Sequence, residues 1–149
     1  MNTQLENATA ADYPEIVEVW EASVRATHHF LEEEHIQFFK PLILRDYLKM
    51  VDLRIVRNDE KRIVAFLGVA DSNLEMLFLH PSSIRKGLGS KLARYAIDEL
   101  KVTKVDVNEQ NPDAVKFYQH MGFTITSRSE KDGLGKPFPI LHMELAKTN

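Results

Sequence analysis

The sequence predicts a mixed α/β fold in which helices flank a single central, mostly antiparallel twisted sheet. Two observations predict it. Four stretches space their apolar residues as a helix with one buried face does, and seven shorter runs have strand-like composition. Their order, β-α-α-β-β-β-α-β-α-β-β, is typical of one mixed sheet with helices on its faces. No repeat or linker interrupts the chain, so one domain is expected over residues 1–149.

The N-terminal third is expected to form a short strand and two helices. Residues 3–8 are the expected strand. The stretch 10–30 has helical spacing, with Asp12 as a plausible N-cap and Pro14 in the first turn. A second amphipathic stretch, residues 33–51, contains a proline at position 41. We expect that proline to kink or divide the helix, because its ring lacks the N–H group that a helix interior uses.

The central third changes to strand-like composition. Three β-rich runs at residues 53–56, 63–70 and 74–79 are separated by the turn-forming segments RNDEKR and ADSN. Strands on short turns pair with their neighbours, so these three runs are expected to form an antiparallel meander.

The remaining elements alternate. Helices are expected at residues 89–100 and 112–121, with a short strand at 103–107 between them. Strands at 123–128 and 140–145 follow, and a loop rich in glycine and proline separates them.

Composition excludes several function classes. A net charge of −3 argues against a protein that binds nucleic acid through general electrostatics. The chain has no cysteine, so disulfides and thiolate chemistry are excluded, and no histidine pair has HExxH spacing, so no metal site is expected. The N-terminus does not resemble a signal peptide, and no apolar run approaches the roughly 18 residues that span a membrane. A cytoplasmic protein with no membrane partner is expected.

Residues 80–91, HPSSIRKGLGSK, join a strand to a helix through a tight turn. The helix N-terminus presents unpaired N–H groups, and Gly87 and Gly89 lack the Cβ atoms that would keep a phosphate away from them. Positive charge lies beside them on Arg85, Lys86 and Lys91. The turn is therefore a candidate phosphate site, although a plain strand-to-helix corner would use the same glycines. Its spacing matches neither the P-loop nor GxGxxG.

The segment NPDAVKFYQHMGF, residues 111–123, is the second candidate element. Asn111 is the expected N-cap, Pro112 fits the first helical position, and Gly122 fits the helix stop. Asn111 and Tyr118 lie about two turns apart, close to one helix face. The tyrosine could present its hydroxyl to a cleft as a proton donor, or could be packed with that hydroxyl satisfied by the protein.

Together these motifs resemble the GCN5-related N-acetyltransferase (GNAT) superfamily over nearly the whole chain. The family pattern N-x-x-A-x-x-F-Y-x-x-x-G-F is matched by Asn111, Ala114, Phe117, Tyr118, Gly122 and Phe123. The family motif Gln/Arg-x-x-Gly-x-Gly/Ala is matched at both glycines but begins here with Ile84. The backbone seat for a pyrophosphate is therefore expected without the usual side-chain contact. The segments SVRATHHFLEEEH and RSEKDGLGKPFPILHMEL are similar to those of small bacterial members.

The resemblance implies the GNAT fold and direct transfer of an acetyl group from acetyl-CoA to an amine of a small molecule or protein. Backbone N–H groups of the strand before the turn would stabilise the charge that develops on the thioester oxygen. Tyr118 would protonate the departing thiolate. Relatives are often dimers, so a homodimer is compatible with the family. The implied coenzyme-binding residues are Leu77, Phe78, Leu79, Arg85, Lys86, Gly87, Leu88, Gly89, Ser90, Lys91, Asn111, Ala114, Phe117 and Tyr118.

Three residues are candidates for the general base. Glu75 lies on the strand that leads into the glycine turn, and His28 and His29 lie where the first helix ends, a region that lines the acceptor side in relatives. Histidine suits proton abstraction near neutral pH, but either ring could equally bind the acceptor or cap the helix. Adjacent helical residues point about 100° apart, so one of the two rings is expected to face the cleft.

The acceptor side is expected between the end of the first helix and the loop 132–139. The acidic run at residues 32–34 could attract a cationic acceptor, although the start of a solvated helix explains it more simply. Phe30 could equally belong to the core. The candidate acceptor-binding residues are Thr27, His28, His29, Phe30 and Phe138.

Two other functions use the same features. A non-catalytic acyl-CoA-binding sensor would keep the cleft without turnover, and a nucleotide-binding domain would use the same glycine turn. Release of thiol from acetyl-CoA when an amine is added would separate the enzyme from both. The sequence does not specify the acceptor amine or the length of the acyl chain.

Overall fold

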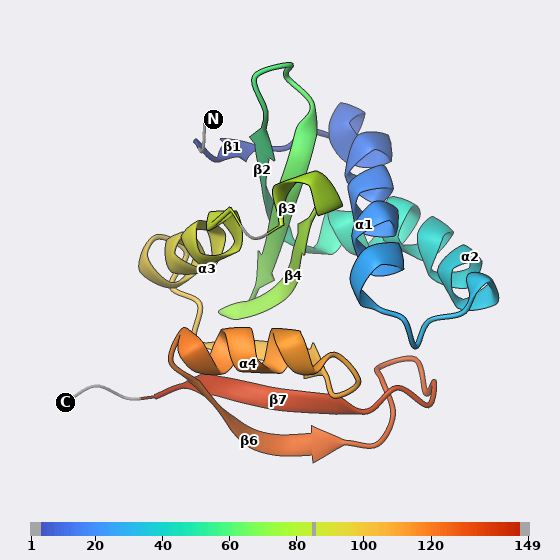
Figure 1. Cartoon of the computed structure of the whole chain (residues 1–149), viewed down its shortest axis with the longest axis vertical. Coiled ribbons are helices and arrows are strands. Elements are labelled where there is room, and N and C mark those ends of the chain that lie inside the picture. The colour runs from blue at the N-terminus through green and yellow to red at the C-terminus, as the bar shows by residue number, and fades with distance from the viewer. Residues whose placement is uncertain (1–3, 85, 147–149) are drawn as a thin grey trace.

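Seven strands form one sheet in the order β1-β2-β3-β4-β5-β7-β6, in a computed structural model that describes residues 4–84 and 86–146 (Figure 1). Only β4 and β5 pair in parallel, so the predicted mixed, mostly antiparallel sheet is confirmed. The strands are β1 (Glu6–Asn7), β2 (Asp52–Arg57), β3 (Ile63–Ala70), β4 (Asn73–Leu79), β5 (Lys104–Asn108), β6 (Phe123–Ser129) and β7 (Ile140–Leu145).

Four α-helices cover the two faces of the sheet. They are α1 (Tyr13–Thr27), α2 (Glu33–Leu42), α3 (Leu88–Asp98) and α4 (Pro112–His120). The first two pack with Phe66 and Ile55 in one apolar cluster, and the last two pack with Leu67 and Val105 in another. The order of elements is the predicted one. No helix in the part of the chain that the structure describes is long and apolar enough to cross a membrane.

The helical region before β2 differs in detail from the prediction. Asp12 occupies the N-cap position of α1 but does not cap that helix, because its carboxylate accepts hydrogen bonds from the Thr9 N–H group (3.0 Å) and from Arg57 (2.9 Å). Residues 10–12 form a separate 3₁₀ turn instead. Pro41 does divide the second stretch: α2 ends one residue later, and a π-helical turn and a 3₁₀ turn complete it.

The meander of β2, β3 and β4 is confirmed. Asp71 and Ser72 join β3 to β4 with φ angles of 50° and 65°, the left-handed pair that a two-residue hairpin turn uses. Within β3, Leu67 and Phe66 face opposite sides of the sheet, and seven of its eight residues are buried. The meander is therefore the central layer between the two pairs of helices.

An irregularity in β4 opens the sheet. Gly68 pairs with Met76 and Val69 pairs with Leu74, so Glu75 is an extra residue in a β-bulge. On its other edge β4 pairs with β5 only at Asn73 and Leu74. Beyond that point β4 has no β5 partner in the described chain, and the two strands diverge. This opening positions the candidate site.

Candidate active site

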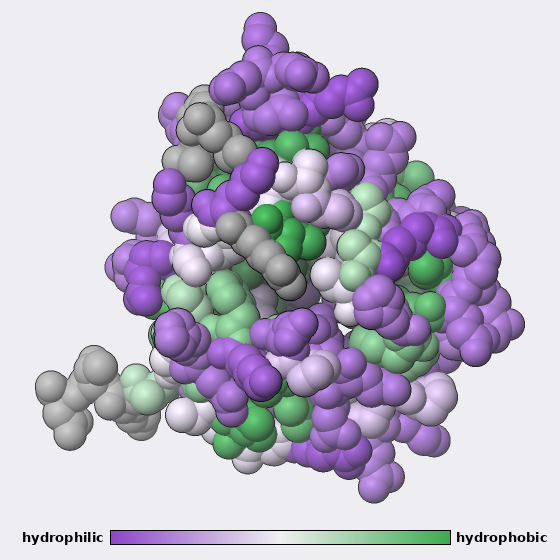
Figure 2. All heavy atoms as spheres, in the orientation of Figure 1, coloured by the Kyte–Doolittle hydropathy of each residue, from purple (hydrophilic) through white to green (hydrophobic). Residues whose placement is uncertain are grey.

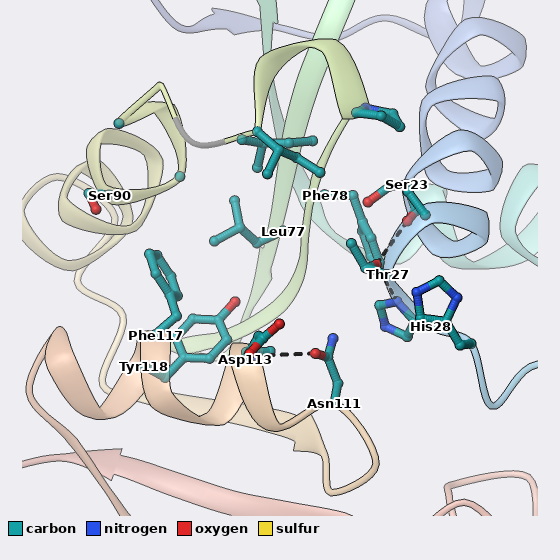
Figure 3. A pocket seen from close by; sticks show the side chains of 18 residues that line it. Ser23, Thr27, His28, Leu77, Phe78, Ser90, Asn111, Asp113, Phe117 and Tyr118 are labelled. Atoms are coloured by element: carbon teal, nitrogen blue, oxygen red, sulfur yellow. Dashed lines mark hydrogen bonds between the residues drawn. The ribbon is translucent and has the colours of Figure 1, made fainter.

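A cavity of about 950 Å³ lies at the opening between β4 and β5 (Figure 3). The end of α1 borders it on one side, the starts of α3 and α4 border it on the other, and β4 runs along its floor. In the space-filling view it is a hollow near the centre of the face, with hydrophobic residues in its walls and hydrophilic residues around it (Figure 2). The predicted site residues that line it are Thr27, His28, His29, Leu77, Phe78, Leu79, Gly87, Gly89, Ser90, Asn111, Ala114, Phe117 and Tyr118.

Other predicted residues lie outside this lining. Leu88 is buried in the core beneath α3, and Lys91 borders a separate shallow hollow on the outer side of α3. Lys86 is exposed in the turn before α3. Glu75, Phe30 and Phe138 are discussed below, and Arg85 lies outside the described residues.

Five lining residues were not among the predicted site residues: Ser23, Ala26, Pro81, Ile84 and Asp113. The sequence contained a signal that could have identified two of these residues. Ser23 and Ala26 lie four and one residues before Thr27, so helical periodicity places Ser23 on the same face and Ala26 beside it. Pro81 and Ile84 are brought in by the 3₁₀ turn Pro81–Ser83, which the sequence analysis did not predict.

The glycine turn gives α3 an open N-terminus. Gly87, the N-cap residue, has φ +79°, and a Cβ there would meet nothing within 4 Å. Glycine is therefore favoured by the left-handed backbone and not by a lack of room for a side chain. A Cβ on Gly89 would lie 3.7 Å from the Phe117 ring, on the cavity side. No side chain caps α3, so its first N–H groups have no protein acceptor in the described chain. These groups can bind an anion.

The start of α4 is built as predicted. The Asn111 side chain accepts a hydrogen bond from the Ala114 N–H group (3.3 Å), and Gly122 follows the helix with φ +107°. Tyr118 is 8% exposed, and its ring packs edge-on against Phe117 and Phe123 at centroid distances of 5.0 and 5.8 Å.

The Tyr118 hydroxyl points into the cavity (Figure 3) and has no hydrogen-bond partner among the described residues. Burial raises the pKa of this phenol well above its usual range. The side chain therefore stays protonated at neutral pH and can donate its hydrogen to a group in the cavity.

His28 is held at the other end of the cavity. The Thr27 hydroxyl donates its one proton to the Ser23 carbonyl (2.8 Å), so it must accept from Nδ1–H of His28, 2.7 Å away. The lone pair of His28 is thereby on Nε2. Burial first, and then the charge of the neighbouring His29, lower the pKa of His28 to about 4. At neutral pH the ring is uncharged, which suits accepting a hydrogen bond better than removing a proton from an amine.

Both histidines line the cavity, so the expectation that one ring alone would face it is wrong. The expectation assumed that the helix runs through residue 30, whereas α1 ends at Thr27. His28 is the C-cap residue with φ −106° and ψ 66°, so the helical 100° separation between neighbours does not apply.

His28 should make folding stability depend on pH. Its folded-state pKa of about 4 lies below the unfolded value, so the unfolded chain binds more protons between the two. The free energy of unfolding is therefore highest above about pH 6.5. It falls by at most about 3 kcal/mol as the pH drops toward 4. Urea unfolding of His28→Gln should show a flatter pH profile. His29→Gln is the control, and an unchanged slope in His28→Gln would contradict the prediction.

Glu75, a candidate for the general base, occupies the bulge of β4 and is not among the residues that line the cavity. Partial burial raises the pKa of its carboxyl group, a hydrogen bond from Asn73 opposes that change, and the charges of Asp106 and Asp71 raise it further. Its carboxyl group therefore lies in an acidic environment.

The loop between β6 and β7 closes against the start of α2. Phe138 is 6% exposed, and its ring lies 5.0 Å from His35, 5.9 Å from Phe30 and 6.4 Å from Phe39. Figure 1 shows this loop facing the segment after α1. Phe138 is thus a buried contact between two loops and lies outside the cavity lining. The acidic run begins α2, where Glu33 pairs with Arg25 (2.7 Å), as the simpler interpretation predicted.

Comparison with known proteins identifies the family. A model described as the acetyltransferase (GNAT) domain matches residues 21–146. The chain belongs to the GNAT family. It is 36% identical over 129 residues to the peptidyl-lysine N-acetyltransferase YjaB of Escherichia coli K12, covering 87% of each chain. Against YjaB of Salmonella typhimurium LT2 the identity is 35% over 128 residues, 86% of this chain and 88% of the relative.

Comparison with solved structures also supports the family assignment. The solution structure of apo YjaB from Escherichia coli superposes with a TM-score of 0.85 at 31% identity, covering 97% of this chain and 98% of that one. The PaiA N-acetyltransferase of Thermoplasma acidophilum, solved with coenzyme A, shares the fold at a TM-score of 0.66 and 18% identity, over 95% and 98% of the two chains. The GNAT assignment confirms the predicted N-acetyltransferase, and use of acetyl-CoA is implied by the family.

Proposed function

We propose that this GNAT enzyme transfers the acetyl group of acetyl-CoA directly to the side-chain amine of a lysine in a protein. The observation that carries the proposal is the cavity itself, which joins the open N-terminus of α3, the unpaired edge of β4 and the Tyr118 hydroxyl. A lysine acceptor is supported by the names of the YjaB relatives, which match most of this chain at more than a third identity.

Each end of the cavity has a role in this proposal. The α3 N–H groups near Gly87 and Gly89 bind the pyrophosphate of the coenzyme, and Ile84 adds apolar surface at the position where the family motif has Gln or Arg. The edge of β4 at residues 77–79 donates N–H groups to the thioester oxygen as charge develops on it. Tyr118 donates a proton to the departing thiolate. His28 and His29, at the far end, face the acceptor.

The test is an acetylation assay with acetyl-CoA and lysine peptides, read by thiol release and by the mass of the acetylated peptide. Gly89→Val places a side chain in the cavity and should weaken acetyl-CoA binding by about 10²-fold, the loss of roughly two charge-assisted hydrogen bonds. Gly133→Val is the matched control, because a Cβ there meets nothing and its backbone is not left-handed.

Three outcomes would contradict the proposal in different ways. Acetyl-CoA binding without thiol release on any amine indicates the sensor function. Thiol release with small amines alone overturns the protein acceptor but keeps the enzyme. Unchanged coenzyme affinity in a folded Gly89→Val protein overturns the pyrophosphate seat.

A further inference from the structure

Two polar atoms at the end of α1 have no partner and belong to residues that line the cavity. Ser23 is 5% exposed, and its hydroxyl makes no hydrogen bond to any described residue. The Nε2 atom of His28 makes none either, because the one hydrogen bond of this ring in the described chain is made by Nδ1. Neither atom is sealed inside the protein, since Asn108 Oδ1 is the one fully buried side-chain atom in the described chain without a partner. A ligand in the cavity can therefore contact both.

Thr27 fixes the positions of these two groups. Its hydroxyl lies 2.8 Å from the Ser23 carbonyl oxygen and 2.7 Å from Nδ1 of His28, so it ties the ring to the last turn of the helix. The ring also packs against Phe30 and Phe78, at centroid distances of 5.4 and 6.1 Å. Figure 3 shows Ser23, Thr27 and His28 together at the end of α1, on the side that faces the cavity. A ligand would meet a preformed pair of groups.

The chemistry of the pair is that of two hydrogen-bond acceptors. Because Nδ1 carries the proton of the uncharged ring, Nε2 of His28 has a lone pair and can accept but not donate. The Ser23 hydroxyl has two lone pairs, and no described group donates to either of them. A neutral primary amine offers two N–H groups and one lone pair. When both N–H groups are bound, the lone pair is the part of the nitrogen that stays free to attack.

We propose that Ser23 and His28 bind the two N–H groups of the acceptor amine and so direct its lone pair toward the thioester. The inference rests on the proposed function and defines its acceptor as a primary amine. The pair holds the neutral amine and takes no proton from it, so its role differs from that of a general base. An N-methyl amine fits the pair less well, because the methyl group replaces one of the two N–H donors.

The test measures kcat/KM for a lysine peptide and for the same peptide with Nε-methyl-lysine. The wild-type enzyme should prefer the lysine peptide by about tenfold, the effect of roughly one hydrogen bond. Ser23→Ala should lower kcat/KM on the lysine peptide by about tenfold. It should not lower the value on the methylated peptide, whose one N–H group can still bind His28. Alanine favours a helix, so the variant is expected to fold.

Ser83→Ala is the matched control, since Ser83 is also a buried serine, 2% exposed, but lies outside the cavity lining. It should leave both values of kcat/KM unchanged.

Thr27→Val tests the positioning of the ring. Valine keeps the shape of threonine but cannot accept the Nδ1–H bond, so the proton of His28 is no longer fixed on Nδ1. Nitrogen NMR of the labelled ring should find the proton on Nδ1 in the wild-type enzyme and partly on Nε2 in the variant. The variant should also lose activity on the lysine peptide. A wild-type ring with its proton on Nε2 would overturn the proposal.

The peptide comparison can also overturn it. An equal loss on both peptides in Ser23→Ala would do so, because a merely structural role predicts that result, and so would unchanged activity on the lysine peptide. If the wild-type enzyme acetylates small amines alone, the protein acceptor is wrong. The same comparison then decides the role of Ser23 with a small primary amine and its N-methyl derivative. A wild-type enzyme that acetylates no amine would instead overturn the proposed function, and this inference with it.

Discussion

Tyr118→Phe is expected to lower kcat by about 10²-fold while leaving acetyl-CoA affinity nearly unchanged. The phenylalanine ring keeps the contacts with Phe117 and Phe123, so the cavity wall is preserved. The hydroxyl that is lost bonds to no described residue, so its removal costs no internal hydrogen bond. The effect lies at the low end for general acids, because a phenol is a weaker acid than the thiol it protonates and burial weakens it further.

Burial of Tyr118 also gives this prediction a pH signature. The donor form is present below its pKa, and because that pKa is raised, the wild-type enzyme should lose no rate through Tyr118 up to about pH 10. Steady-state kcat and calorimetric coenzyme binding measure the two effects. Tyr13→Phe, on α1 and away from the cavity, is the control. Full kcat in Tyr118→Phe would show that water or another group protonates the thiolate.

Local sequence signals predicted much of the fold and one half of the site. The seven strand runs, the hairpin at ADSN and the caps of α4 each depend on a few neighbouring residues, and all are present. The glycine turn could also be predicted from the sequence. Gly87 has no side chain, so it can adopt a left-handed conformation and cannot cap the helix that follows. Most of the residues predicted to bind the coenzyme therefore line the cavity, and their binding role stays a prediction.

Side-chain contacts across the sheet depend on pairings that local signals do not contain. His142 lies 36 residues from Asp106 and 13 from Ser129, and the register of β5, β7 and β6 brings the three side chains together. The sequence analysis accordingly assigned no role to His142. The bulge at Glu75 likewise follows from the register of β4 on β3. Asp12 does not cap α1 because its carboxylate is bound both by the Thr9 N–H group, three residues away, and by Arg57, 45 residues away.

Phe138→Ala is expected to destabilise the protein by about 3–5 kcal/mol, the usual cost of removing a buried phenylalanine ring. The loss should exceed that of a typical loop residue, because Phe138 joins three aromatic side chains from α2 and the segment after α1. Urea unfolding measures it, and the melting temperature should fall by about 10 °C or more. Phe38→Ala is the matched control, since that ring is 43% exposed and packs on Phe39 and Lys136.

The same variant separates a structural role for Phe138 from an acceptor-binding one. Phe30 contacts both Phe138 and His28, so releasing the loop removes support from the acceptor end of the cavity while the α3 turn is untouched. Below its unfolding temperature, Phe138→Ala should therefore raise the KM for the peptide and leave coenzyme affinity unchanged. A parallel loss of coenzyme affinity would mean that the β6–β7 loop supports the whole cavity. A stability loss no larger than that of Phe38→Ala would mean that the aromatic contacts of this loop do not hold it in place.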